Sequence, residues 1–187
     1  MLRHYRLWRL LFWGGGSLMA LLSLALALIG FLSPPPQLLW PSPAYGRLYR
    51  GNGQIATVTL RWQGDRDGYW EGRLSSFPVG TTASFHSGTE HGFFVVHLPD
   101  GQLLALTERS NHLGQRLYWS DPLPYWGVAG FMDHDYGSAY RANGERLGGP
   151  ARRALDPYPL TIVDDRVRIA GRAACPNPTL LWEAWCR

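Results

Sequence analysis

The sequence predicts a mainly β protein, with a small β-sandwich or barrel-like domain and one N-terminal transmembrane helix. Three observations lead to this fold class. Of the 187 residues, 17% are charged, and residues 10–32 form an uninterrupted uncharged, apolar segment. After that segment the chain consists of short alternating stretches between turn residues, which are typical of β-strands. It contains neither a long amphipathic helical pattern nor an internal repeat, so a helical bundle is not expected.

The segment at 10–32 reads LLFWGGGSLMALLSLALALIGFL. As a helix it would be about 35 Å long, enough to cross a hydrocarbon core of about 30 Å. A cleaved signal peptide is the main alternative, because Ala25-Leu26-Ala27 resembles a cleavage site. The length of the apolar run favours a retained anchor, since the apolar region of a signal peptide spans about 7–15 residues.

The basic residues at the N-terminus predict the orientation of this helix. Arg3, Arg6 and Arg9 precede it and no arginine follows it closely, so residues 1–9 form a cytoplasmic tail. The protein is then a single-pass protein of the cell membrane, with its β-domain on the periplasmic or extracellular side. The remaining arginines are nearly balanced by 14 acidic residues, so nucleic-acid binding is not expected. All 18 basic residues are arginine, which excludes mechanisms that use a catalytic lysine.

Composition divides the rest of the chain into three parts. Residues 33–45 form a proline-rich tether, because three consecutive prolines favour an extended spacer. Residues 46–170 form the β-domain, and residues 171–187 form a C-terminal tail. The tail contains Cys175 and Cys186, which are candidates for a disulfide in an oxidising compartment. Two unrelated thiols are the alternative.

Three hairpins are predicted in the β-domain. In the first, residues 56–62 alternate apolar and polar side chains, and residues 69–74 follow after a turn-rich stretch. In the second, residues 93–98 and 102–106 are joined by Pro99-Asp100-Gly101. In the third, residues 159–163 and 166–170 flank Asp164-Asp165.

Four further features occur in a fixed order: FPVG at 77–80, VVHLPDGQLLALTERSNHLG at 95–114, FMDHDYGSAYRANGERLGGPARRAL at 131–155 and YPLTIVDDRVRI at 158–169. From about residue 77 to 170, roughly half the chain, this order resembles the Rieske iron–sulfur domain. The anchor and proline-containing tether are also similar to those of membrane Rieske subunits of quinol-oxidising cytochrome b complexes. The resemblance implies a Rieske-like fold and a place in electron transfer.

The resemblance also implies two cluster-binding loops, which in the family read C-T-H-L-G-C and C-P-C-H-G-S. Each loop supplies one thiolate and one imidazole to a [2Fe–2S] cluster, and the remaining cysteines form a disulfide between the loops. The matching cluster positions of this chain are Ser110, His112, Asp133 and Tyr136, and the disulfide positions are Gln115 and Asp135. Of the four ligands, only the imidazole at His112 is kept. A hydroxyl is a poor substitute for a thiolate, so no cluster is expected and the cofactor prediction is none.

The predicted function is therefore a non-catalytic subunit of a membrane-bound respiratory or photosynthetic electron-transfer complex, with an assembly, stabilising or docking role. Its partners would be integral membrane subunits, and a soluble electron carrier is a further candidate. No catalytic constellation such as a hydrolase elbow or a phosphate-binding loop is found, so an enzyme is not expected.

Two alternatives remain open. One is a mononuclear metal site near His112, with His134, Asp133 and Asp135 as further nitrogen and oxygen donors, in an anchored enzyme or sensor. The other is an unrelated anchored β-domain that binds an external partner. His86, His91 and His97 are expected to be solvated positions around a hairpin rather than a second metal site.

Overall fold

The computed structural model describes residues 43–64, 68–86 and 92–171. The predicted anchor at 10–32, most of the tether, and both Cys175 and Cys186 lie outside the described residues. Within these three ranges, no helix is long and apolar enough to cross a membrane.

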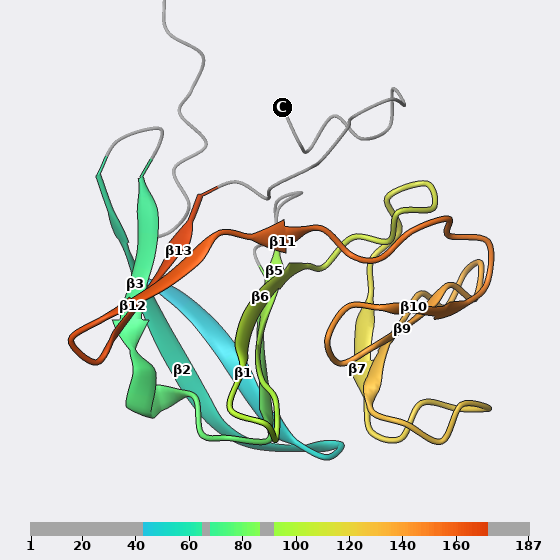
Figure 1. The fold of residues 1–187 in the computed structure, drawn as a ribbon, viewed down its shortest axis with the longest axis horizontal. Helices are drawn as coiled ribbons and strands as arrows, with labels where there is room; N and C mark the ends of the chain where they lie inside the picture. The colour runs from blue at the N-terminus through green and yellow to red at the C-terminus, as the bar shows by residue number, and fades with distance from the viewer. Residues whose placement is uncertain (1–42, 65–67, 87–91, 172–187) are drawn as a thin grey trace, which may run out of the picture. The chain divides into compact units, whose positions relative to one another are not determined.

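The described chain forms two antiparallel sheets (Figure 1). The larger sheet has nine strands in the order β11-β6-β5-β4-β1-β2-β3-β13-β12, and the smaller has four in the order β10-β9-β8-β7. The strands of the large sheet are β1 (Ala44–Arg50), β2 (Gly53–Gln63), β3 (Tyr69–Arg73), β4 (Thr81–Phe85), β5 (Phe93–His97), β6 (Leu103–Thr107), β11 (Pro157–Tyr158), β12 (Leu160–Val163) and β13 (Arg166–Ala170). Those of the small sheet are β7 (Tyr118–Ser120), β8 (Gly130–Met132), β9 (Ala139–Arg141) and β10 (Arg146–Gly148). A single turn of 3₁₀-helix, η1 (Leu74–Ser76), follows β3.

All three predicted hairpins are confirmed. β2 pairs with β3, β5 with β6, and β12 with β13, each in antiparallel register. The third turn has an unusual backbone, because Asp164 and Asp165 have φ angles of 47° and 61°. Two successive residues with positive φ twist a two-residue turn in the direction that matches the flanking strands. The mainly β fold class is therefore correct.

Three strands of the large sheet were not predicted from the sequence: β1, β4 and the two-residue β11. β1 begins at Ala44, so Ala44 and Tyr45, predicted as the end of the tether, belong to this strand. The physical reason is burial: Ala44 and Leu48 pack into the core, while Tyr45 and Arg47 on the alternate face are exposed.

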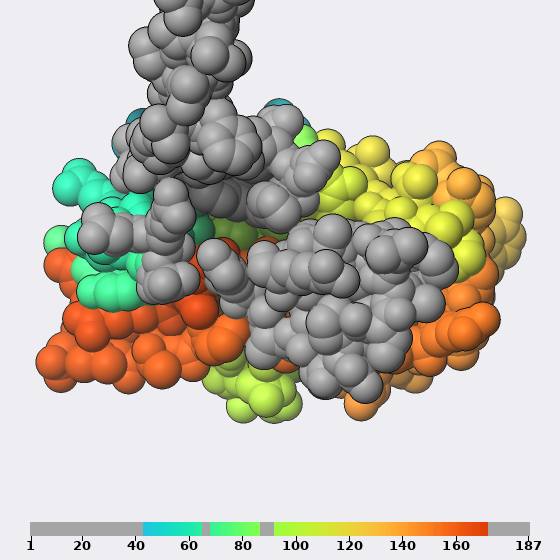
Figure 2. Space-filling model, turned by 90° about the horizontal axis from the view of Figure 1, so that it is seen from above, coloured from blue at the N-terminus to red at the C-terminus, as the bar shows by residue number. Residues whose placement is uncertain are grey.

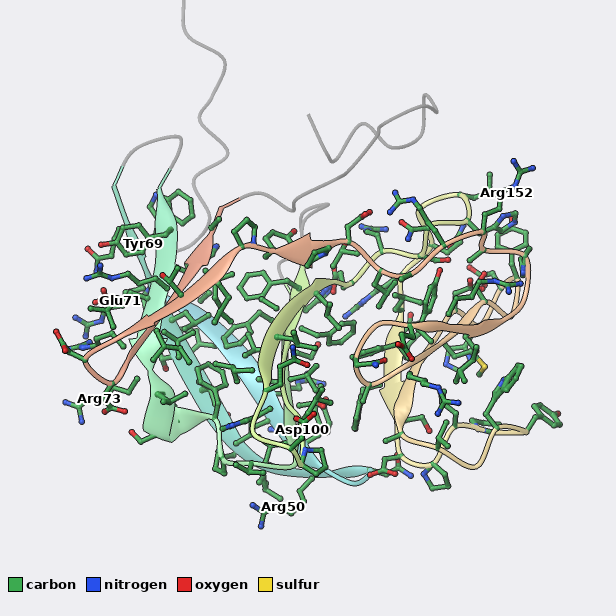
Figure 3. All side chains as sticks on the ribbon, in the orientation of Figure 1. Arg50, Tyr69, Glu71, Arg73, Asp100 and Arg152 are labelled. Carbon is green, nitrogen blue, oxygen red and sulfur yellow. The ribbon has the colours of Figure 1, made fainter. Side chains whose placement is uncertain are left out.

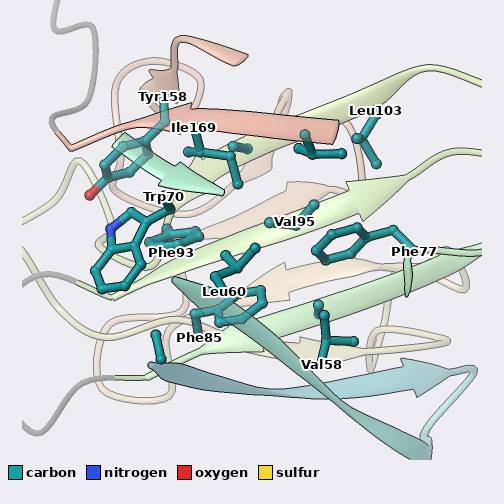
Figure 4. Packing of buried hydrophobic residues seen from close by; sticks show 14 of the residues in the cluster. Val58, Leu60, Trp70, Phe77, Phe85, Phe93, Val95, Leu103, Tyr158 and Ile169 are labelled. Carbon is teal, nitrogen blue, oxygen red and sulfur yellow. The ribbon is translucent and has the colours of Figure 1, made fainter. Parts of the chain in front are cut away.

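The large sheet curls around one hydrophobic core (Figure 4). Strands near both ends of the sheet contribute to it, Tyr158 from β11 at one edge and Ile169 from β13 near the other. Aromatic rings fill the centre: Phe85 stacks on Phe93 with ring centroids 5.1 Å apart, and Phe93 lies 6.4 Å from Trp70. Because distant strands share one set of buried side chains, the sheet has the barrel-like curvature predicted for the domain.

A second core joins the two sheets. It lies on the opposite face of β5 and β6, where Phe94 stacks on Phe131 of β8 with centroids 4.5 Å apart. Tyr140 of β9, fully buried, belongs to the same cluster. The small sheet is thus held against the outer face of the β5–β6 hairpin, at the end of the domain away from β3 and β13 (Figures 1 and 2).

The outer face of β3 is polar. Tyr69, Glu71 and Arg73 alternate with buried residues along the strand and point away from the core (Figure 3). The guanidinium of Arg168 on β13 donates a hydrogen bond of 3.0 Å to Glu71 and lies over the ring of Tyr69. This part of the sheet shows the apolar-in, polar-out alternation of a strand pair with one solvated face.

The second core predicts that Phe94 contributes strongly to stability. Phe94→Ala should lower the free energy of unfolding by about 3–5 kcal/mol, because it opens a cavity between the sheets. Tyr125→Ala is the matched aromatic control, since Tyr125 is fully exposed, and it should change stability by less than about 0.5 kcal/mol. Urea unfolding of both variants measures the difference, and a similar loss in the two would contradict the role given to Phe94.

Candidate functional site

The first candidate loop, residues 110–115, leaves β6 and turns back toward the small sheet. Its ends are closed by a hydrogen bond of 2.7 Å from the Ser110 N–H to the Gln115 carbonyl. Leu113 and Gly114 both have positive φ angles, 57° and 67°. A leucine in this region is uncommon, and here it leaves the side chain 44% exposed at the loop tip.

The second candidate loop, residues 133–138, joins β8 to β9 and is organised by one carboxylate. Asp133 is fully buried, and its Oδ1 accepts hydrogen bonds from the N–H groups of Tyr136 and Gly137, at 2.6 and 2.9 Å. Its Oδ2 accepts a third, at 3.2 Å, from the N–H of Ser138. A buried charge requires such partners, so the aspartate and the loop conformation depend on each other.

Three contacts link the first loop to the second loop and to the strand that follows it. The hydroxyl of Ser110 shares a hydrogen bond of 3.1 Å with the hydroxyl of Tyr140 on β9, and the N–H of Asn111 donates to the same tyrosine oxygen at 3.2 Å. The ring of His112 meets the ring of Tyr136 edge-to-face, with centroids 5.2 Å apart. Of the four predicted cluster positions, His112 and Tyr136 therefore contact each other between the loops, Ser110 is hydrogen-bonded to β9, and Asp133 holds the second loop together.

The remaining predicted positions are less closely associated. Gln115 is half-buried, while Asp135 and His134 are exposed. The ring of His134 packs against Tyr118, with centroids 4.8 Å apart. Among the described residues, no group of three or more His, Cys, Asp or Glu side chains is placed to hold a metal ion.

Two residues of the site were missed in the sequence. Tyr140 looks like an ordinary inward-facing strand residue, and only the fold brings its hydroxyl to Ser110. Asn111 also contributes, because its side-chain amide donates to the carbonyl of Ala154 in the segment after β10. Burial raises the pKa of Tyr140 above its usual value, and this outweighs the hydrogen bond from Ser110, which lowers it.

The oxygen donors of the site do not fit a [2Fe–2S] cluster. The Ser110 hydroxyl is engaged with Tyr140 and also accepts a hydrogen bond of 3.2 Å from the N–H of His112. Both carboxylate oxygens of Asp133 accept backbone N–H groups of their own loop. The loops offer one imidazole and no thiolate at the matching positions, and their oxygens are directed to the protein itself.

Comparison with known proteins gives structural similarities only. No protein-family model matches the chain, and no curated protein matches it. It is similar to the plasma-membrane Rieske protein PetC3 of the cyanobacterium Synechocystis PCC 6803, with 19% identity and a TM-score of 0.33, over 54% of this chain and 84% of that one. It is also similar to a chain of a hyperthermophilic respiratory complex III, with 19% identity and a TM-score of 0.45, over 82% and 96% of the two chains. The first of these belongs to the family that the sequence resembles, but at TM-scores below 0.5 neither carries an argument about function.

The second loop generates a stability prediction. Asp133→Ala removes the acceptor of three backbone N–H groups and should lower the free energy of unfolding by about 2–4 kcal/mol. Asp135→Ala, an exposed carboxylate of the same loop, is the matched control and should change it by less than about 0.5 kcal/mol. Urea unfolding distinguishes them, and equal effects would mean that the loop does not depend on Asp133.

The buried phenol of Tyr140 generates a pH prediction. Its folded pKa is raised above 10.0, so in alkali the unfolded chain releases this proton first. Its contribution to stability is therefore complete below pH 10 and is lost as the pH rises further, by at most about 1.4 kcal/mol per pH unit. Tyr140→Phe should reduce the alkaline slope of the free energy of unfolding, whereas Tyr125→Phe, which removes an exposed hydroxyl, serves as the control. An unchanged slope in Tyr140→Phe would contradict the assignment.

Proposed function

We propose that this chain is a non-catalytic, cluster-free, Rieske-like subunit of a membrane-bound electron-transfer complex. The observation that carries the proposal is the burial and the hydrogen bonding of Ser110 and Asp133. Both lie at positions where the family resemblance expects thiolates, and both are fully buried with oxygens that are hydrogen-bonded within the site. The loops are thus held by hydrogen bonds within the chain, at positions where the family would bind iron. The fold is kept while the redox chemistry is lost.

A structural role suits the exposed end of the two loops. Leu113 of the first loop and Tyr136 of the second are 44% and 48% exposed, and Tyr118 on the neighbouring strand is 45% exposed. Large apolar side chains grouped at a loop tip favour contact with another protein. In the proposal this tip contacts an integral membrane subunit or a soluble electron carrier, and the predicted helix at 10–32 packs among the helices of the complex.

The mononuclear metalloprotein is the weaker candidate. It needs His112 together with nearby carboxylates, yet Asp133 directs both oxygens to its own backbone and the His112 ring packs on Tyr136. A ligand set used in this way would have to rearrange before it could bind an ion. An unrelated anchored β-domain that binds an external partner is the third candidate, and the same exposed tip would serve it.

Purification from native membranes tests the proposal. The full chain, isolated in mild detergent, should bring with it stoichiometric haem- or pigment-bearing subunits whose visible spectrum identifies the complex. A chain that is recovered alone and colourless would contradict membership of such a complex. Equal abundance in membranes that lack any such complex would contradict it as well.

Metal analysis of the same preparation tests the absence of a cluster. After subtraction of the haem iron and any metal assigned to the partner subunits, we expect less than about 0.1 equivalent of transition metal per chain. A stoichiometric remainder with acid-labile sulfide would contradict the cluster-free proposal. A stoichiometric remainder without sulfide would favour the mononuclear site.

A further inference from the structure

A groove of about 520 Å³ lies on the face of the large sheet opposite its main core. One side is formed by β1, through Tyr45, Arg47 and Tyr49, whose side chains alternate with the buried residues of that strand. The other side is formed by the segment that enters the small sheet, through Arg116, Tyr118 and Trp119. The volume is within the range of about 300–1,000 Å³ that small-molecule sites occupy.

Two arginines line the groove. Arg47 is exposed, and within the described parts of the chain no carboxylate lies at ion-pair distance from it. Arg116 is half-buried, and its Nε is shielded from solvent and lacks a hydrogen-bond partner. The guanidinium of Arg116 lies over the ring of Tyr118, 5.4 Å from its centroid. An arginine packed over an aromatic ring presents its remaining N–H groups to a ligand with little loss of conformational freedom.

A buried carboxylate beneath the groove compensates the charge of Arg116 but not that of Arg47. Glu108 is 1% exposed and accepts a hydrogen bond of 3.1 Å from the N–H of Gly92. It also lies 3.2 Å from Nδ1 of His86 and 3.7 Å from Nε of Arg116. The carboxylate of Glu108 is shared among these three partners, and Arg47 is not one of them. The charge of Arg47 therefore remains available at the open side of the groove.

The walls of the groove are aromatic and in part fixed. The indole N–H of Trp119 donates a hydrogen bond of 2.9 Å to the carbonyl of Gly51 in the β1–β2 turn, which ties one wall to the other. Tyr45 is 64% exposed, so a flat ring is available to a ligand. Aromatic faces close to an uncompensated arginine match a ligand that has a ring and an acidic group.

We infer that this groove binds a small organic anion in which an aromatic ring carries a carboxylate or a phosphate. The acidic group pairs with Arg47 and with the N–H groups of Arg116 that do not face Glu108, and the ring packs on the exposed ring of Tyr45. The inference does not depend on the proposed function, because Arg47 and Tyr45 lie on β1 and not in the two candidate loops, although Tyr118 lines the groove and also contacts His134 of the second loop. The carboxylate and the phosphate share the same recognition by guanidinium groups, and the experiment below separates them.

Calorimetric titration of the full chain in uncharged detergent tests the inference. Benzoate and phenylphosphate are the probes, and benzamide is the neutral control of the same shape. At least one acid should bind saturably at a single site, about tenfold or more tightly than benzamide. The tighter of the two acids identifies the class of ligand. No saturation by either acid up to roughly 10 mM, or equal binding of benzamide, would overturn the inference.

Two arginines of the same strand locate the binding. Arg47→Gln should weaken the acid by about tenfold, because it removes a charge-assisted hydrogen bond. Arg50→Gln is the matched control, since Arg50 is also exposed on β1 but does not line the groove, and it should change binding less than about twofold. Arg47→Lys keeps the charge and should keep part of the affinity. Equal losses in Arg47→Gln and Arg50→Gln would overturn the assignment of the site.

Discussion

The hairpin of β5 and β6 is buried on both of its faces, and the rest of the domain is arranged around it. Phe93, Val95 and Ala105 face the core enclosed by the large sheet, whereas Phe94 and Leu106 face the small sheet. A strand buried on both sides has no polar face, which explains why this segment reads as a continuous apolar run. The hairpin has one set of side chains for each core, so each sheet is positioned by contact with the same pair of strands.

Much of this architecture could be predicted from the sequence, since the three hairpins have strong local signals. Their strands alternate or are continuously apolar, and their turns contain Gly, Pro or paired Asp residues. β1 and β4 lack such signals. The exposed face of β1 carries Tyr45 and Tyr49, so its apolar and polar faces differ little, and β4 contains Thr and Ser at buried or half-buried positions. Their strand structure is fixed by pairing with each other and with β2 and β5.

The two loops of the candidate site could be predicted from the sequence, but the contacts that hold them could not. Sequence order identified the positions, and the pairing of β8 with β9 places Tyr140 close behind the second loop. That a tyrosine hydroxyl would meet Ser110 follows from how the sheet packs, which no local pattern records. Asp133 illustrates the same limit. As a residue type it suggested a metal donor, but the loop turns its own N–H groups toward the carboxylate, and this makes it a structural group.

The contact between Gly92 and Glu108 restricts how this chain can change over time. A Cβ atom at position 92 would lie 2.0 Å from the Cδ atom of Glu108, so no larger residue fits there while the glutamate stays in place. A shorter side chain at 108 would make room, but it would give up the hydrogen bond that the Gly92 N–H donates. Gly92 lies just before β5 and Glu108 just after β6, and position 92 can therefore accept a larger residue only if the side chain at 108 becomes shorter or moves. Among related sequences, a larger residue at position 92 should be accompanied by a shorter one at position 108.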